Sequence, residues 1–196
     1  MRKQALIRGQ AIACALGDDL ETVVAAARAM RPKVVRLPLV LAGMEEDRPY
    51  FLLARREGGA LNGEAEPFFY GVLFDTVGRA LADAALTAAE IRETAIFLGS
   101  TSIDVPVYEQ AYEQRLRETS AETVMVSSGY GKIADEVARR FGIRGPAYTF
   151  TTACTSSANA LLYAAGMIAA GRIRRALVIG YDLFSHLGFY GFESLR

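Results

Sequence analysis

The sequence predicts a layered α/β fold in which helices cover a mostly parallel sheet. Two continuous apolar runs, Ala95–Gly99 and Ala176–Gly180, are typical of strands buried on both faces. A third strand-like run at 147–152 leads directly into apolar residues at helical spacing over 158–169. A strand, a helix and a further strand in this order form the parallel crossover unit, so the alternation of elements favours a parallel sheet.

The first elements of the chain are expected to be short. The segment 5–16 is apolar enough for a first strand that ends in a turn. Asp18 or Asp19 can then cap a helix whose apolar residues fall on one side. Two strand-like pieces at 34–42 and 50–54 follow, and polar turns separate them.

The later elements carry clearer end signals. A long amphipathic helix is expected over 68–86, and the residues 87–90 match a capping box that begins a short helical turn. Another helix is expected from Asp104 to about Leu116, after the central strand. The last one before the third strand-like run covers 132–141, where a glycine closes it.

Length and composition indicate one packed domain over residues 1–196. The chain is 52% apolar, and its 22 basic and 22 acidic residues leave no net charge to attract a polyanion such as nucleic acid. Its two cysteines, Cys14 and Cys154, form no CxxC pair, and the single histidine, His186, cannot complete a zinc site with them. We therefore expect neither a disulfide framework nor a catalytic metal.

No targeting or membrane segment is expected. The N-terminus resembles a signal peptide superficially, but Arg8 and Gln10 interrupt its apolar stretch. No run approaches the roughly 18 uncharged apolar residues of a membrane span. The cytoplasm is the compartment consistent with this pattern.

Cys154 is the strongest candidate for a catalytic residue, because it lies where the strand-like run gives way to the helical pattern. At such a corner the helix dipole and unpaired backbone N–H groups favour the reactive thiolate. The small neighbours Ala153, Thr155, Ser156 and Ser157 let a substrate approach closely. The alternative is that Cys154 is a small buried apolar residue, as many cysteines are.

His186 could assist that cysteine as a general base or ion-pair partner. Parallel strands at 147–152 and 176–180 would end on one edge of the sheet, on the side where Cys154 emerges. A Cys154–His186 dyad is therefore one hypothesis, and a loop or interface histidine is the other.

Three further features have simpler explanations. Ser128–Ile133 places a lysine after glycines but lacks the first glycine and the final hydroxyl of a phosphate-binding loop, so we interpret it as a helix entry. The basic cluster Arg172, Arg174 and Arg175 follows the far end of the Cys154 helix, where a solvated turn is expected. Cys14 is interpreted as a core residue.

Four segments together resemble the β-ketoacyl-acyl-carrier-protein synthases, the elongating condensing enzymes of the thiolase-like superfamily. The most specific is the cysteine segment, and weaker similarity extends over nearly the whole chain. The segments are Phe141–Ala147, Thr152–Ala160, Ile168–Gly171 and Ala176–Gly180. The resemblance implies a thiolase-like half, with a mostly parallel five-stranded sheet and helices on both faces.

The resemblance also implies a reaction. Cys154 would be the nucleophile that accepts an acyl group from a carrier-protein thioester, and its backbone N–H would supply half of an oxyanion hole. Family members then decarboxylate malonyl-carrier protein and condense the enolate with the acyl thioester. No cofactor is implied beyond the phosphopantetheine arm that carries the substrates.

The implied partners are an acyl carrier protein, the C-terminal half of the synthase and a second subunit, as a homodimer or a ketosynthase heterodimer. Relatives are about twice as long, and their decarboxylating histidines and lysine lie in the second half, so we expect that half to be absent here. Little condensation is then expected from these residues alone. His186 does not match a family histidine, and residues 148–152 would lie at the dimer interface.

Two departures and two alternatives remain open. Tyr181 stands where relatives have a glycine, and the segment before the long helix carries Glu64 and Glu66 with only Arg55 and Arg56 nearby, which would weaken docking of an acidic carrier. One alternative is a non-catalytic chain-length-factor subunit, against which the retained Cys154 argues. The other is a thiolase that uses coenzyme A thioesters. Acyl length and pathway, whether fatty acid, polyene or polyketide, are not predicted.

Overall fold

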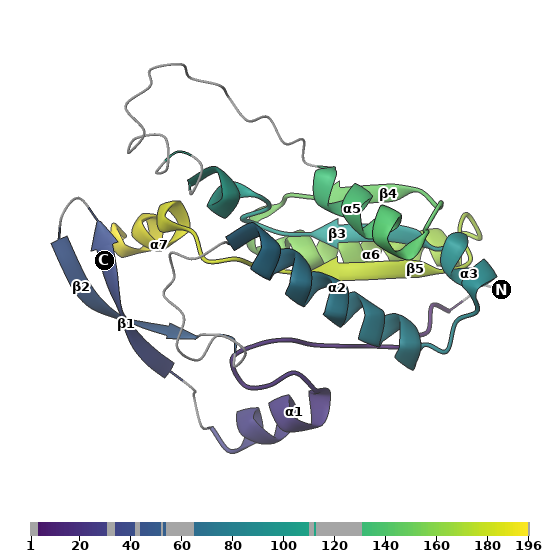
Figure 1. Cartoon of the computed structure of the whole chain (residues 1–196). Coiled ribbons are helices and arrows are strands. Elements are labelled where there is room, and N and C mark those ends of the chain that lie inside the picture. The colour runs from purple at the N-terminus through teal and green to yellow at the C-terminus, as the bar shows by residue number, and fades with distance from the viewer. Residues whose placement is uncertain are drawn as a thin grey trace. The chain divides into compact units, whose positions relative to one another are not determined.

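The computed structural model describes most of the chain as two units (Figure 1). The first unit is formed by Met1–Ile7, Glu64–Tyr70 and Ala85–Arg196, and the second by Arg8–Gly63 and Gly71–Ala84. The residues described within these units are 4–30, 34–41, 44–51, 53, 65–109, 112 and 131–195.

The first unit contains a parallel sheet whose central strand is β3 (Ala95–Gly99). It lies between β4 (Ala147–Phe150) and β5 (Ala176–Gly180), so the order is β4-β3-β5 and the expected crossover from β4 to β5 passes over β3. Phe97 is the register partner of Tyr148 on one side and Val178 on the other. The α/β class and the parallel direction are confirmed. Five strands are not: the described residues place three in this sheet.

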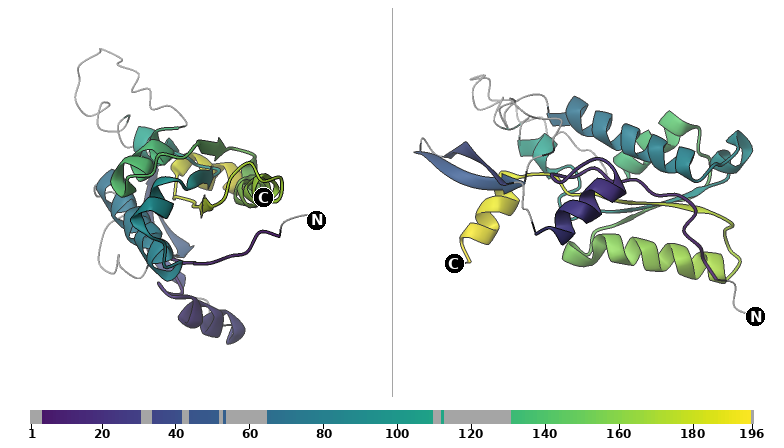
Figure 2. Two further views of the ribbon diagram at one scale, coloured as in Figure 1. Left: turned by 90° about the vertical axis from the view of Figure 1, so that its right-hand side faces the viewer. Right: turned by 90° about the horizontal axis from the view of Figure 1, so that it is seen from below.

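The core of this unit forms around β3, whose five residues are all buried. Ala95 and Phe97 pack against Ala160 and Ala164 of α6 (Ser156–Ala169). Because side chains alternate along a strand, Ile96 and Leu98 face the opposite side. Figure 2 shows α6 on one side of the sheet and α5 (Lys132–Phe141) on the other. The continuous apolar run at 95–99 thus has the double burial that its sequence predicts.

Helix ends in the first unit follow their capping signals. In α3 (Ala88–Arg92), the side chains of Thr87 and Glu90 form the expected reciprocal capping box. Gly142 ends α5 with a φ of 67°, in the left-handed region that favours glycine. Residues 105–109 are helical as expected, and most of the predicted remainder to Leu116 lies outside the described residues. The last helix is α7 (His186–Glu193).

The second unit contains α1 (Leu20–Arg28), the strands β1 (Val34–Leu41) and β2 (Met44–Phe51), and most of α2 (Ala65–Asp83). Asp19 is the N-cap of α1, because its side chain accepts a hydrogen bond from the Thr22 N–H at 2.8 Å. The predicted long helix at 68–86 corresponds to α2, which begins and ends somewhat earlier.

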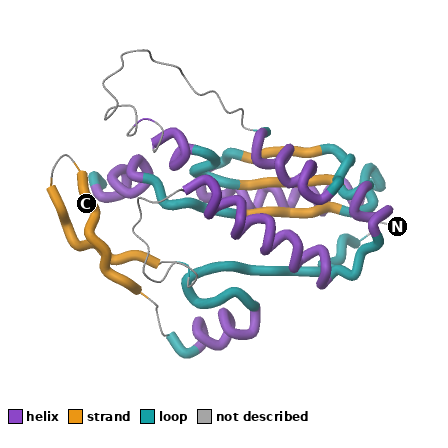
Figure 3. The backbone as a smooth tube through the Cα atoms, in the orientation of Figure 1, coloured by secondary structure: helices purple, strands orange, loops and turns teal. Residues whose placement is uncertain are grey.

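Of the strand and turn expected over 5–16, the turn is present at 15–16 and the strand is wrong. Figure 3 shows its described part as a loop, and only an isolated bridge joins Cys14 to Gly17. Its backbone polar groups bond to α2 side chains instead: the Gln10 N–H donates to Asp83 at 2.9 Å, and the Ile12 carbonyl accepts from Arg79 at 3.1 Å. Because side chains of α2 provide hydrogen-bond partners for these backbone groups, the segment does not need a neighbouring strand to provide them.

The polar turn expected between 42 and 50 is also wrong, because Met44–Phe51 pairs antiparallel with β1. Alternation of apolar and polar residues is absent there, so the strand gives no period-two signal. A two-stranded sheet consists only of edge strands, which tolerate charges and proline; Pro38 lies opposite Asp47 and Pro49 opposite Arg36. Pairing across the hairpin, rather than intrinsic preference, makes this segment a strand.

None of the helices in the described part of the chain has the length and apolar character needed to cross a membrane.

Candidate functional site: the cysteine corner

Cys154 lies on a short bridge between strand and helix, which we call the cysteine corner (Thr151–Ser156). After β4 ends, a 3₁₀ turn covers Ala153–Thr155, and α6 begins at once. The Cys154 side chain is exposed, so the alternative of a buried apolar cysteine is wrong. The corner therefore presents a thiol to the outside of this unit, at the carboxyl end of β4.

The backbone of the corner is held in an unfavourable conformation by its own hydroxyl groups. Ala153 has a φ of 50°, in the left-handed region that a residue with a Cβ rarely adopts. The buried Ser156 hydroxyl accepts from the Thr152 N–H at 2.9 Å and donates to the Ala153 carbonyl at 2.7 Å. Thr101, from the loop after β3, donates to the same carbonyl at 3.1 Å. Such a conformation persists only where surrounding contacts enforce it.

A second group of polar contacts lies on the helix side of Cys154. The Asn159 side-chain amide donates to Thr152 Oγ1 at 2.8 Å and to Thr155 Oγ1 at 3.3 Å. Thr155 Oγ1 in turn donates to the Thr152 carbonyl at 2.6 Å. These bonds fix the residues on both sides of the cysteine.

Two glycines at strand ends allow α6 to approach the sheet closely. A Cβ built on Gly99 would lie 2.5 Å from the Ser156 carbonyl oxygen, and one on Gly180 would lie 2.6 Å from Ser157 Oγ. Contacts below 3.0 Å are essentially never seen for real Cβ atoms, so a side chain at Gly99 would displace the backbone at the start of α6, whereas one at Gly180 would displace the Ser157 hydroxyl. Gly99 and Gly180 thus determine how close the cysteine corner lies to the strand ends.

A second corner, the Tyr181 corner (Tyr181–Ser185), follows β5 at the same carboxyl end of the parallel sheet. The Tyr181 ring lies 5.1 Å from that of Phe69, and its hydroxyl donates to the Ile103 carbonyl at 3.1 Å. The Leu183 N–H donates to Ser102 Oγ at 3.2 Å. Burial raises the pKa of the Tyr181 phenol above its ordinary value, so the group stays protonated as a donor. This corner therefore supports the loop that carries Thr101.

His186 does not join Cys154. It is the first residue of α7, where the N–H groups of His186 and Leu187 donate to the Glu109 carboxylate at 2.8 and 2.7 Å. Its ring lies against Phe184 and Tyr190, at centroid distances of 5.4 and 6.3 Å. Within the described part of the chain no hydrogen bond links the imidazole to the thiol. The hypothesis of a Cys154–His186 dyad is therefore not supported, because aromatic packing orients the ring.

The basic cluster after α6 is structural, as its position predicts. Arg175 pairs with Glu90 at 3.1 Å and Glu93 at 3.5 Å, and Arg174 lies 3.9 Å from the latter. These pairs join the turn to α3. Cys14, expected in the core, is only partly buried.

Other predicted features lie outside the described residues. They are the first part of the glycine–lysine motif, Ser128–Tyr130, and the charged residues Arg55, Arg56 and Glu64.

Sequence reasoning missed the residues that hold the corner: Thr101, Ser156 and Asn159. The signal that could have found Thr101 is the run of hydroxyl residues, Ser100–Ser102, directly after a buried strand. In a parallel sheet such a run must meet the loops that follow the neighbouring strands. Ser156 and Asn159 were visible only as parts of the cysteine segment.

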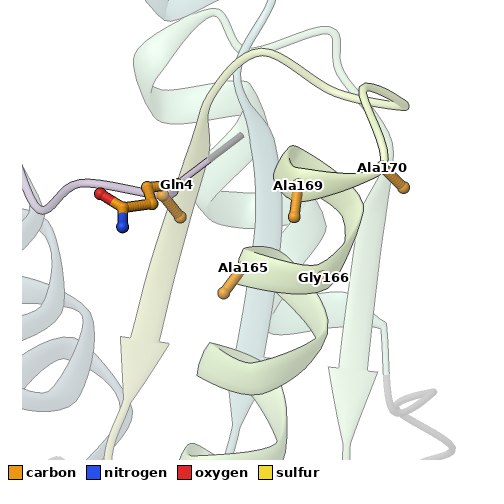
Figure 4. Close-up of a pocket in the computed structure, with 6 residues that line it drawn as sticks. Gln4, Ala165, Gly166, Ala169 and Ala170 are labelled. Carbon is orange, nitrogen blue, oxygen red and sulfur yellow. The ribbon is translucent and has the colours of Figure 1, made fainter. Parts of the chain in front are cut away.

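The outer side of α6 is apolar and uncovered in this unit. Leu161, Leu162 and Tyr163 are exposed large hydrophobic residues. A shallow hollow lies farther along the helix (Figure 4), where small side chains meet the N-terminal segment. Its lining residues are Gln4, Ala5, Ala165, Gly166, Ala169 and Ala170. The residues that line this hollow include no ionisable side chain.

Comparison with known proteins identifies the family of this chain. Residues 68–196 match the family described as beta-ketoacyl synthase, N-terminal domain, and they include the whole cysteine corner. The polyketide synthase GfsB of Streptomyces halstedii is 30% identical over 151 residues, which are 74% of this chain and 2% of that protein. The highly reducing polyketide synthase calA of Penicillium decumbens is 34% identical over 127 residues, 63% of this chain and 4% of that protein.

Solved structures share the fold. The ketosynthase ApeO in complex with its chain length factor ApeC, from Xenorhabdus doucetiae, matches with a TM-score of 0.71 at 20% identity, over 95% of this chain and 50% of that one. The ishigamide ketosynthase/chain length factor matches with a TM-score of 0.75 at 22% identity, over 100% of this chain and 51% of that one. The chain thus spans about half of these structures and a few per cent of the curated relatives. By its family match over residues 68–196, the chain belongs to the beta-ketoacyl synthases and contains their N-terminal domain.

Proposed function

We propose that Cys154 accepts an acyl group from a thioester, as the first half-reaction of a β-ketoacyl synthase. The observation that carries the proposal is the exposed thiol of Cys154 at the strained strand-to-helix corner, within the segment that matches the family. A thiol at such a corner is open to a substrate and lies directly before the N-terminus of α6. Metal and nucleotide chemistry have no corresponding observation in the described residues.

The reaction at Cys154 proceeds by nucleophilic acyl substitution. The thiolate attacks the thioester carbonyl carbon, and the negative charge moves to the carbonyl oxygen of the tetrahedral intermediate. Collapse of that intermediate expels the carrier thiolate, which takes up a proton, and leaves the acyl group on the Cys154 sulfur. Among the described residues the Cys154 N–H donates to no other group, so it is available to the oxyanion.

Condensation follows on a second substrate. Loss of carbon dioxide from a malonyl thioester gives an enolate, whose carbon attacks the acyl carbonyl and releases the Cys154 thiolate. The product is a β-ketoacyl thioester longer by two carbons. No cofactor takes part, and both substrates arrive on the phosphopantetheine arm of an acyl carrier protein.

A second half completes this site. The exposed side chains of Leu161, Leu162 and Tyr163 on α6 support the proposal, since several large uncovered apolar side chains on one helix are typical of an element that another part of a protein covers. The match to about half of each ketosynthase structure is consistent with it. Residues 1–196 form one N-terminal domain in this proposal, and alone they support no condensation because the decarboxylating groups are not among them.

A second subunit pairs at β4. This strand lies at the edge of the described sheet, and Tyr148 stays partly exposed although its ring stacks on Phe97 at 5.0 Å. An uncovered edge is a template for pairing with another strand. Homodimer and ketosynthase heterodimer both satisfy this geometry.

The test is acylation of the exposed cysteine. The chain is incubated with an acyl thioester of N-acetylcysteamine, a small mimic of the phosphopantetheine arm, and its peptides are examined by mass spectrometry. We expect an acyl adduct on the peptide that contains Cys154. Cys14, the other cysteine, is the internal control for unspecific thiol exchange, and Cys154→Ala is the matched variant.

The outcomes separate the proposed function from its alternatives. An adduct that appears equally on Cys14 and Cys154, or on neither, contradicts the proposed acyl transfer and favours the non-catalytic subunit. Acyl-coenzyme A as the faster donor, compared with acyl-carrier protein, favours the thiolase alternative. Turnover of malonyl-carrier protein by this chain alone contradicts the need for a second half.

A further inference from the structure

We infer that Thr101 is a positioning residue that aims the Cys154 N–H for acyl transfer. Thr101 lies in the loop after β3, outside the cysteine segment, and does not contact the thiol. It acts on the peptide group that joins Ala153 to Cys154. The inference rests on the proposed acylation of Cys154.

The Ala153 carbonyl is held by three donors. The Ser156 N–H belongs to the helical turn, and Ser156 Oγ donates at 2.7 Å from within the same corner. Thr101 Oγ1 donates at 3.1 Å and is the donor of the three that comes from another part of the sheet. The first two move with the corner, whereas Thr101 connects it to the central strand.

The direction of the Cys154 N–H follows from peptide geometry. No peptide bond in the described residues is cis, and in a planar trans peptide the N–H points opposite to the C=O. Fixing the Ala153 carbonyl therefore fixes the Cys154 N–H on the other side of the same plane. This N–H makes no hydrogen bond within the described part of the chain, so no partner of its own holds it.

The strain at Ala153 makes the external bond necessary. A residue with a Cβ at a φ of 50° lies in a sparsely populated region and relaxes unless its surroundings enforce the angle. Relaxation of φ at Ala153 would swing its carbonyl and the following peptide, and so turn the Cys154 N–H away from the oxyanion. Thr101 opposes this movement from the loop after β3, which does not take part in it.

The test compares two reactions of the same sulfur in Thr101→Val, Thr101→Ser and the unmodified chain. Acylation by an acyl thioester passes through an oxyanion, whereas alkylation by iodoacetamide displaces iodide and forms none. Valine keeps the shape of threonine without the hydroxyl, and serine keeps the hydroxyl. Loss of an oxyanion donor costs about 10²–10³-fold in rate, and we expect misdirection to slow acylation by at least about tenfold in Thr101→Val.

The ratio of the two rates decides the inference. We expect alkylation to stay within about twofold in all three proteins and Thr101→Ser to restore acylation, since reactivity of the thiol itself is unchanged. Equal slowing of both reactions in Thr101→Val, or no slowing of either, overturns the positioning role.

A second measurement tests, without any acylation, whether the Thr101 hydroxyl holds the Ala153 carbonyl. With Ala153 labelled with carbon-13, loss of a hydrogen bond moves its carbonyl resonance upfield. We expect that shift in Thr101→Val and not in Thr101→Ser. An unmoved resonance in Thr101→Val would show that the Thr101 hydroxyl does not hold the Ala153 carbonyl. If the unmodified chain forms no acyl adduct, the proposed function fails, while the carbonyl resonance still decides whether Thr101 fixes the peptide.

Discussion

The two corners that follow β4 and β5 lie at the same carboxyl end of one parallel sheet, but one is exposed and polar and the other is packed. The cysteine corner is polar and exposed, and hydroxyl groups hold it against the strain at Ala153. The Tyr181 corner is filled by an aromatic ring against Phe69 and ends at the buried Ser185. The same strand geometry thus supports an exposed polar corner and a packed one. The packed corner in turn bonds to the loop that carries Thr101.

The largest effect is expected from Gly99→Ala, which removes the space beneath the cysteine corner. The new Cβ would lie 2.5 Å from the Ser156 carbonyl oxygen, a backbone atom that cannot rotate away. We expect a loss of about 3 kcal/mol in the free energy of unfolding, at the upper end for overpacking. Chemical denaturation measures it.

The matched control is Gly166→Ala, the same substitution within α6. A Cβ there meets nothing within 4 Å, so helix propensity alone predicts a gain of up to about 1 kcal/mol. Equal losses in both variants would contradict the close approach at Gly99.

A smaller loss is expected from Ser156→Ala, which breaks the cysteine corner from within. The Thr152 N–H loses its acceptor and the Ala153 carbonyl loses one of its donors, both in part-buried hydrogen bonds to the buried Ser156 hydroxyl. Leaving such a group unsatisfied costs about 2 kcal/mol. The alkylation rate of Cys154 should change as well, because the corner moves. Ser157→Ala, whose hydroxyl makes one long bond of 3.3 Å to Gly99, should change stability less.

Tyr181→Phe tests whether the packed corner is purely structural. Loss of the bond to the Ile103 carbonyl should cost about 1 kcal/mol and leave alkylation of Cys154 unchanged. Because burial raises the pKa of the phenol, the folded chain keeps a proton that the unfolded chain loses above about pH 10. The stabilisation is complete below that pH and decreases as pH rises further. Denaturation at pH 8 and 11 should show the difference in the unmodified chain and less of it in Tyr181→Phe.

The smallest effect is expected at Asp19, an exposed cap in the second unit. The hydrogen bond from the Thr22 backbone lowers the pKa of this carboxyl below its ordinary value of 3.8. Its contribution to stability is therefore present above that pH and is lost as pH falls through the folded pKa. Asp19→Asn keeps a capping side chain but cannot titrate. Helicity followed by circular dichroism should fall at low pH in the unmodified chain slightly more than in the variant.

Much of the sheet and the position of Cys154 between a strand and a helix could be predicted because their signals are local. The apolar runs at 95–99 and 176–180, the capping box at 87–90 and the glycine that ends α5 each determine their own element. Cys154 was found from its place between strand and helix. Local physical chemistry is sufficient for all of these.

What could not be predicted depends on partners distant in sequence. The segment 5–16 becomes a loop because α2 side chains satisfy its backbone, and Met44–Phe51 becomes a strand because β1 pairs with it. Thr101 meets Ala153 only once β3 and β4 lie side by side. His186 has the right residue type at the carboxyl end of the sheet, yet its ring packs against Phe184 and Tyr190 and makes no hydrogen bond to the thiol within the described residues. No single stretch of sequence contains this information.

The uncovered side of α6 has a consequence for handling the chain in solution. The exposed apolar side chains of Leu161, Leu162 and Tyr163 favour association between molecules. The charges of 22 basic and 22 acidic side chains cancel, so the net charge is zero at pH 7. Electrostatic repulsion between molecules is therefore weak at neutral pH, and the exposed apolar side chains of α6 can then associate. Light scattering of the chain should therefore rise toward neutrality and fall in more alkaline buffer, where each molecule acquires a net negative charge.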